Sequence, residues 1–236
     1  MQYLAIEGVI GSGKSTLLAY LDQHFSSKLK CFSEPLDLYS HFLSHNPIQR
    51  SYASPRTDAS IAQLHIIETS KKFYSKSVLF KNIQETDQCL LITERSALSP
   101  FFFIKSGYMS EIYSDFVYDY LMKKCSDSIL SPDVVVPSVT IILDLDLGEC
   151  NQRIRKRERV GEENISLEYQ ENLRKNMLNL ANLTPNCKIL PIKPSDSVET
   201  VAEKLFHLLG FKTDFPEGEK NDSNLTAEAH DNSNLA

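Results

Sequence analysis

Short apolar runs alternate with longer amphipathic segments along most of this chain. The runs are short enough for strands buried on both faces, and the segments between them place apolar residues at helical spacing. Strands are predicted at 3–7, 29–33, 89–93, 139–145 and 187–192, and helices from Lys14 onward, at 58–85, 111–124, 149–183 and 198–209. Because strands alternate with helices, we predict an α/β fold, a doubly wound parallel five-stranded sheet with helices on both faces.

Two helical segments carry further expectations. The segment 58–85 is expected to turn Ile61, Leu64, Ile66 and Ile67 toward the core. The segment 149–183 is highly charged and is expected to break near Val160–Gly161.

The pattern also sets the domain organisation. One domain is expected over 1–212, and 213–236 is expected to be a disordered tail, because Asn, Asp, Ser and Glu dominate it. The first residues enter a strand without a basic region or cleavage site, so we expect no signal peptide. Apolar runs such as Pro100–Ile104 fall far below the roughly 18 residues of a membrane span. We therefore expect a cytoplasmic protein without membrane contact.

Charge and cysteine content narrow the function classes. The formal net charge of −6 argues against broad nucleic-acid binding through phosphate neutralisation. The five cysteines are an odd number and form no CxxC pair, so neither a disulfide framework nor a zinc site is indicated. Reduced cysteines in a cytosol-like compartment are the simplest interpretation.

A phosphate-binding loop follows the first strand. Residues 8–15 fit the pattern G-x-x-x-x-G-K-[ST], between a strand and a helix as that motif requires. Its backbone N–H groups and the helix N-terminus favour phosphate, Lys14 can reach the β- and γ-phosphates, and Ser15 can offer its hydroxyl to Mg²⁺. The predicted nucleotide-binding residues are Gly8, Val9, Ile10, Gly11, Ser12, Gly13, Lys14, Ser15 and Thr16. The loop indicates a nucleoside triphosphate, but not whether water or a substrate receives the phosphate.

Charged residues follow two other strands. Glu94 and Arg95 end the third strand, where ligands bind in a doubly wound sheet, so Glu94 can orient Mg²⁺ and Arg95 can hold an acceptor or a phosphate. Glu34 follows the second strand and could take a proton from an acceptor hydroxyl. The alternatives are a surface ion pair and simple loop punctuation by Pro35.

An arginine-rich segment marks a candidate lid at about 153–165. Arg153 and Arg157 share one helix face, Lys156 is expected to point elsewhere, and Arg159 can join the pair only if the helix loosens toward Gly161. Arginines of this kind neutralise the charge that develops on a transferred phosphoryl group. The alternative is a solvated basic helix face.

These motifs, in this order and at these spacings, resemble the deoxyribonucleoside kinase family from about Tyr3 to Leu209. The family has a P-loop kinase fold, a Glu-Pro after its second strand, a Glu-Arg-Ser after its third and an arginine-rich lid before a Ser-Leu-Glu-Tyr-like stretch. This chain has Glu34–Pro35, Glu94–Ser96, the lid arginines and Ser166–Tyr169. The resemblance implies phosphoryl transfer from ATP or another nucleoside triphosphate, with Mg²⁺, to the 5′-hydroxyl of a deoxyribonucleoside for nucleotide salvage, and a homodimer.

The resemblance also implies residue roles. Glu34 matches the base that deprotonates the 5′-hydroxyl, and Arg95 the arginine that orients it. The other implied substrate contacts are Gln63 to the nucleobase edge, Tyr52 and Glu162 to the sugar 3′-hydroxyl, and Tyr39 as an aromatic wall of the pocket.

The chain departs from the family at the base pocket. Members that accept deoxycytidine and purines pair an arginine and an aspartate at the positions of Ser70 and Pro100. Without that pair the pocket resembles that of thymidine-accepting members, which favours pyrimidines, thymidine first.

Two alternative functions stay open. In a thymidylate-type nucleoside monophosphate kinase an arginine commonly stands at the position of Ser33, and a kinase-fold subunit without catalysis could lack Lys14 or Glu34.

Overall fold

The computed structural model describes residues 2–40, 51, 55–81 and 90–211. The predicted sheet of five parallel strands is confirmed, and its strand order is β2-β3-β1-β4-β5. The strands are β1 (Gln2–Gly8), β2 (Leu29–Phe32), β3 (Leu90–Glu94), β4 (Val139–Asp144) and β5 (Cys187–Pro191). The chain extends the sheet on one side of β1 and then on the other. The carboxyl end of β1 therefore lies where the strand order reverses, and open α/β sheets bind ligands there.

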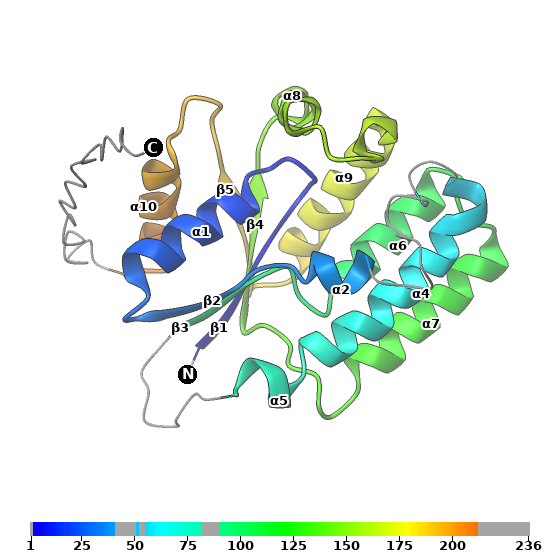
Figure 1. Ribbon diagram of the computed structural model, residues 1–236, viewed down its shortest axis with the longest axis horizontal. Coiled ribbons are helices and arrows are strands. Elements are labelled where there is room, and N and C mark those ends of the chain that lie inside the picture. The colour runs from blue at the N-terminus through cyan, green and yellow to red at the C-terminus, as the bar shows by residue number, and fades with distance from the viewer. Residues whose placement is uncertain (1, 41–50, 52–54, 82–89, 212–236) are drawn as a thin grey trace, which may run out of the picture.

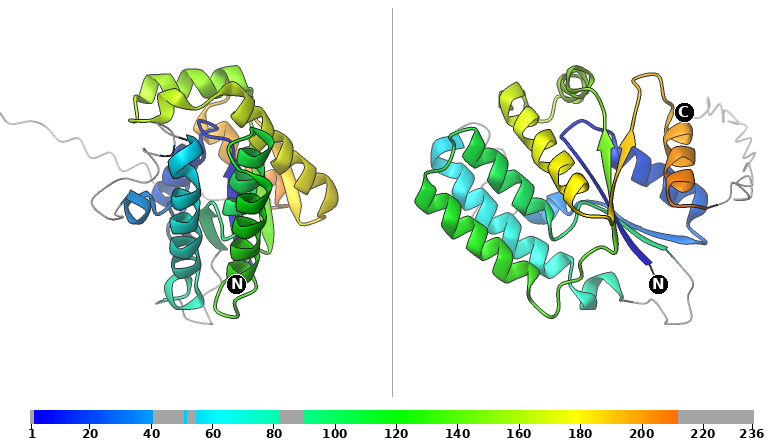
Figure 2. Two further views of the ribbon diagram at one scale, coloured as in Figure 1. Left: turned by 90° about the vertical axis from the view of Figure 1, so that its right-hand side faces the viewer. Right: turned by 180° about the vertical axis from the view of Figure 1, so that it is seen from behind.

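Helices cover both faces of the sheet (Figure 1). On one face lie α1 (Lys14–Phe25) and α10 (Val198–Leu208), and on the other α6 (Ser99–Met109) and α9 (Leu167–Leu183). Helices α4 (Pro55–Phe73) and α7 (Asp115–Ile129) pack outside α6. The shorter elements are α2 (Leu36–Ser40), α5 (Lys76–Leu79), α8 (Leu147–Arg157) and the 3₁₀ turn η1 (Glu162–Asn164). Figure 2 shows α8 crossing above the strand ends, where the lid was expected.

The helices on each face of the sheet pack against it through a separate apolar core. Leu17 and Leu21 of α1 meet Leu205 and Phe206 of α10 against one face of the sheet. On the other face, apolar side chains of α6 and α9 cover β4 and the start of α8; they include Phe102, Leu173 and Met177. Burial of these side chains fixes the strand ends relative to the helices that carry the polar residues described below.

The predicted helix 58–85 is wrong in its length and in part of its apolar face. The helix α4 ends at Phe73, and α5 begins only at Lys76. Between them the Tyr74 ring is fully buried, and Ser75 forms a bridge with Val134, so the chain leaves the helical path to complete the core. Ile67 is buried as expected, but the Ile61 side chain is 50% exposed.

Three other helices differ from prediction. The run Pro100–Ile104 belongs to α6, which was not predicted because its segment is apolar almost throughout and shows little helical periodicity. The predicted helix 111–124 is displaced to α7, whose N-cap is Ser114. The third segment, 149–183, differs only in that its first helix begins at Leu147: it divides into α8, η1 and α9, and the predicted break near Val160–Gly161 is confirmed, since Gly161 adopts a φ of 91° there.

The expectations about cysteines and membrane spans can be compared with the structure over the described residues. Cys31, Cys125, Cys150 and Cys187 are free thiols. No helix in the described part of the chain has both the length and the apolar character needed to cross a membrane. The predicted tail 213–236 lies outside the described residues.

Candidate active site

A cleft of about 1480 Å³ lies at the carboxyl edge of the strands. It exceeds the roughly 300–1,000 Å³ usual for a single small ligand, so it has room for two substrates. Most predicted site residues line it: Ile10, Gly11, Ser12, Gly13, Lys14, Ser15, Thr16, Glu34, Tyr39, Gln63, Glu94, Arg95, Arg153, Arg157, Arg159 and Glu162. Gly8 and Val9 do not line it and instead turn carbonyl groups toward Lys14. Tyr52 lies outside the described residues.

The phosphate loop is curled tightly around the Lys14 ammonium group. Lys14 Nζ donates hydrogen bonds to the carbonyl oxygens of Gly8 (3.2 Å) and Val9 (3.0 Å). Burial, together with the smaller effect of the nearby Arg95 charge, lowers the pKa of Lys14 to about 8, although acidic neighbours oppose the shift. A bound polyphosphate would favour the charged form of this lysine. The buried Lys14 ammonium group contacts neutral carbonyl oxygens of the loop, so a bound anion would balance its positive charge.

Gly11 has no room for a side chain. Its φ is 86°, and an added Cβ would lie 2.5 Å from the carbonyl oxygen of Cys150 in α8. The phosphate loop thus packs backbone to backbone against the helix that begins the lid.

We expect Gly11→Ala to destabilise the fold more than Gly210→Ala does. Gly210 also has a positive φ, 79°, but no atom lies within 4 Å of its added Cβ, so its substitution measures backbone strain alone, about 1–2 kcal/mol. The Gly11 variant adds the clash with Cys150. Urea unfolding of both variants measures the difference, and equal losses of unfolding free energy would contradict the packing described for Gly11.

Arg95 connects Glu7, in β1, with Glu34, which follows β2. Its Nε donates to Glu34 Oε2 (3.1 Å), and its Nη1 donates to Glu7 Oε2 and to the Gly8 carbonyl oxygen (both 3.3 Å). Its guanidinium also stacks over the Phe103 ring at 4.6 Å. Burial alone would lower the pKa of Arg95, but Glu34 and Glu7 raise it, so the side chain stays charged.

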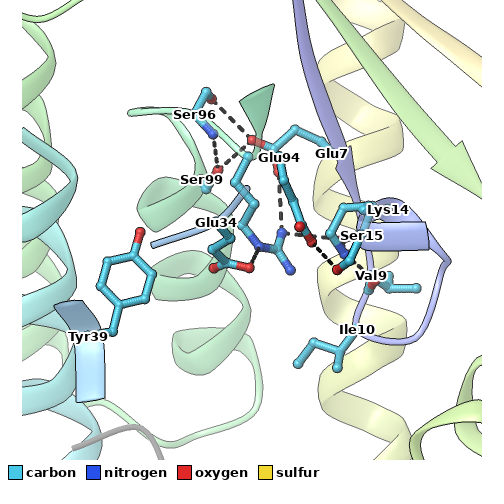
Figure 3. A network of polar contacts seen from close by, with 12 residues as sticks. Glu7, Val9, Ile10, Lys14, Ser15, Glu34, Tyr39, Glu94, Ser96 and Ser99 are labelled. Carbon is cyan, nitrogen blue, oxygen red and sulfur yellow. Dashed lines mark hydrogen bonds and ion pairs between the residues drawn. The ribbon is translucent and has the colours of Figure 1, made fainter. Parts of the chain in front are cut away.

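Glu7 is a fully buried carboxylate behind Arg95. Ser99 Oγ (2.5 Å) and Ser96 Oγ (3.1 Å) both donate to its Oε1. Burial raises the pKa of Glu7, whereas Arg95 and the two serines favour its ionised form. Figure 3 shows the resulting network, with Glu34 and Tyr39 on one side and Lys14 and Ser15 on the other. The network joins the phosphate loop to the part of the cleft lined by Glu34 and Tyr39.

Ser15 and Glu94 bring hard oxygen ligands together. Ser15 Oγ donates to Glu94 Oε1 at 2.8 Å. No group of three or more His, Cys, Asp or Glu within the described ranges could hold a metal alone. Mg²⁺ is commonly bound by a few protein oxygens together with substrate phosphates and water, so this pair fits that ion.

The part of the cleft around Tyr39 is lined by groups from α2, α4 and α6 that are uncharged apart from Asp37 of α2. Tyr39 OH and Ser70 Oγ lie 3.2 Å apart, and both residues are buried. Burial raises the pKa of the Tyr39 phenol. Gln63 lines the same wall, and its buried Oε1 has no partner among the described residues. Pro100, near the start of α6, completes this part of the lining.

The lid arginines are ordered by two carboxylates. Arg157 binds Glu162 through two hydrogen bonds of 2.7 Å, and Arg159 reaches Glu162 Oε1 at 3.3 Å. Arg153 instead pairs with Glu149 at 2.9 Å and lies beside Gly13 of the phosphate loop. Arg159 joins the group because the helix ends at Arg157 and Glu158 takes a left-handed conformation. Lys156 also lines the cleft, so the expectation that it points elsewhere is wrong.

Sequence reasoning missed three residues of this site. Glu7 carried a signal, since a carboxylate at the end of an otherwise apolar strand needs buried partners. Phe103 lay within an unrecognised helix. Gln170, described below, gave no signal in its own segment, because the contact depends on how α9 packs.

Comparisons with known proteins agree with this geometry. A family model described as deoxynucleoside kinase matches residues 4–209. A putative kinase protein, 143R, of Invertebrate iridescent virus 6 is 25% identical over 85% of this chain and 93% of its own length. Human mitochondrial thymidine kinase 2 is 28% identical over 71% of this chain and 60% of its own. A solved structure of deoxyadenosine kinase from M. mycoides with bound dATP shares the fold, with a TM-score of 0.70 at 21% identity over 89% of this chain and all of that one.

Proposed function

This chain belongs to the deoxynucleoside kinase family, and on that premise we propose that it phosphorylates the 5′-hydroxyl of deoxyribonucleosides, pyrimidines first, for nucleotide salvage. The phosphate donor is ATP or another nucleoside triphosphate. The observation that carries the proposal is the ion pair of Glu34 with Arg95, in the same cleft as the phosphate loop. A carboxylate beside a phosphate site fits a reaction in which a hydroxyl group must lose its proton.

Glu34 is the residue we assign to the acceptor. Its Oε2 accepts the hydrogen bond of Arg95, which leaves Oε1 to take the 5′-hydroxyl proton. The 5′-oxygen bonds to the γ-phosphorus as the bond from that phosphorus to the β,γ-bridging oxygen breaks, and the nucleoside diphosphate leaves with that oxygen. Arg95 is fixed in turn by Glu7. The base is therefore held in place before the substrate arrives, so little reorganisation is needed during the reaction.

Lys14 and the lid arginines are assigned to the donor. Lys14 exchanges its two carbonyl contacts for the β- and γ-phosphate oxygens. Arg153, Arg157 and Arg159 neutralise the charge that spreads over the γ-phosphoryl oxygens during transfer. Ser15 and Glu94 would hold Mg²⁺, which supplies further charge neutralisation when bound.

We expect thymidine or deoxyuridine to show a higher kcat/KM than deoxyguanosine. The pocket wall presents Ser70, Tyr39 and Pro100, which carry no charge, and the relative named mitochondrial thymidine kinase 2 supports the same direction. The measurement is direct competition between the acceptors at one ATP concentration. A preference for the purine would contradict this view of the pocket.

The same panel tests the rival function when thymidylate is included as an acceptor. Ser33, next to Glu34, offers no cation for an acceptor phosphate. Phosphorylation of thymidylate in preference to thymidine would therefore replace the proposal with a monophosphate kinase. Retention of Lys14, Glu34 and the lid arginines in one cleft argues against a subunit without catalysis.

We further propose a cytoplasmic homodimer. Helices α4 and α7 lie side by side at one edge of the molecule (Figures 1 and 2). Both carry exposed apolar side chains. These include Ile61 on α4 and Phe116, 82% exposed, on α7. Large exposed apolar side chains gathered on neighbouring helices are typical of a protein interface, so these residues support the proposal. Sedimentation velocity of the purified protein measures the oligomeric state, and a monomer at micromolar concentration would contradict the proposal.

A further inference from the structure

A glutamine on α9, Gln170, binds the main chain of the phosphate loop at Ile10. Gln170 Nε2 donates to the Ile10 carbonyl oxygen at 2.9 Å, and the Ile10 N–H donates to Gln170 Oε1 at 3.2 Å. Gln170 has no exposed surface, and Ile10 is also buried. Both polar groups of the Ile10 main chain are thus paired with one side chain, where a lost partner would leave them unsatisfied at a substantial cost.

The position of Gln170 ties this contact to the lid. Gln170 lies in the first turn of α9, and its own N–H donates to the carbonyl oxygen of Ser166, the N-cap that follows the lid. The backbone N–H of Ile165, the residue before Ser166, donates to the carbonyl oxygen of Glu162. The side-chain carboxylate of Glu162 in turn holds Arg157 and Arg159. An unbroken series of hydrogen bonds and short chain links therefore runs from the phosphate loop to the lid arginines.

We propose that Gln170 is a positioning residue for the phosphate donor: it sets the loop at Ile10 in register with α9 and the lid. The amide is suited to this role because it donates and accepts at once, as a paired backbone strand does. Ile10 is two residues from Ser12 and four from Lys14, so a shift at Ile10 moves the groups that face the phosphates. This inference rests on the proposed function only in that the donor is a nucleoside triphosphate.

The test is Gln170→Met, which keeps the length of an unbranched side chain and removes both hydrogen bonds. We expect the Kd for ADP and the KM for ATP to rise about 10-fold, the scale of one or two lost hydrogen bonds. The KM for the nucleoside acceptor should change by less than about twofold, because Gln170 touches the donor loop and not the acceptor wall. ADP affinity is measured by calorimetry, so it does not depend on the acceptor or on turnover.

The matched control is Asn176→Leu on the same helix. Asn176 is also buried, but its Nδ2 donates to Ser106 Oγ of α6, away from the phosphate loop. We expect this control to lower the melting temperature while leaving the Kd for ADP within about twofold of the wild type. The inference is overturned if Gln170→Met changes donor and acceptor constants equally, if it only lowers the melting temperature, or if both variants weaken ADP binding alike. Inactivity of the wild-type protein toward every nucleoside would instead refute the proposed acceptor and leave the ADP comparison valid.

Discussion

Glu34→Gln is expected to lower kcat by about 10²–10⁴ while nucleotide binding is retained. Glutamine keeps the shape of the side chain and can still accept the hydrogen bond from Arg95 Nε, but it cannot take a proton from the acceptor. The decrease in kcat therefore measures the loss of proton transfer rather than a change in the structure of the site. Single-turnover rates with saturating ATP and nucleoside are the direct measurement, since they isolate the chemical step.

A second glutamate-to-glutamine change serves as the control for that experiment. Glu68 is exposed on α4 and does not line the cleft, so Glu68→Gln should leave turnover near the wild-type value. If Glu34→Gln retains more than about a tenth of wild-type turnover with chemistry rate-limiting, Glu34 is not the general base.

Arg157→Ala is expected to lower kcat by about 10²–10⁴, somewhat below the largest effects of arginine fingers because Arg153 and Arg159 remain. ADP affinity should fall much less, since Lys14 and the loop N–H groups already hold the β-phosphate in the ground state. The variant also removes two hydrogen bonds from Glu162, which is only 5% exposed. Acceptor binding should weaken modestly as a result, because Glu162 is the proposed contact to the sugar 3′-hydroxyl.

Arg155 provides the comparison within the same helix. Arg155 is exposed and does not line the cleft, whereas Lys156 does line it and would not isolate the effect. Arg155→Ala should therefore keep nearly wild-type kcat. Equal losses in the two variants would indicate a general electrostatic effect, and near-normal kcat in Arg157→Ala would indicate a solvated basic face.

The sequence predicted the parts of the site that local patterns specify. The phosphate loop depends on a contiguous motif, and Glu34 and Arg95 directly follow strands, so parallel pairing alone brings them to one edge. The five strands were found because each is a compact apolar run. Helix bounds were less accurate where tertiary burial outweighed periodicity, as at Tyr74 and throughout α6.

Contacts between distant segments could not be predicted in this way. Gln170 lies 160 residues from Ile10, and Glu7 lies 88 residues from Arg95. Neither distance is encoded in a local pattern, because each contact follows from the packing of whole elements on the sheet. The family resemblance supplied expected roles for Gln63 and Glu162, whereas the structure adds Glu7 and Gln170, which hold Arg95 and the phosphate loop in place.

The contact between the Tyr39 hydroxyl and Ser70 Oγ lies in a different part of the cleft from the phosphate loop. It joins α2 to α4, and His65 of α4 reinforces it by pairing with the Leu38 carbonyl oxygen. The residues that we assign to the phosphates come mainly from α1, α8 and the segments that follow β1 and β3, so they belong to a different part of the framework. On the proposed function, we therefore expect substitutions within the α2–α4 unit to alter which nucleobase is accepted while Lys14 and Arg95 keep their partners. An ancestral enzyme built in this way could diversify its substrates by changes in one unit, and a designer seeking a new acceptor should vary the same residues first.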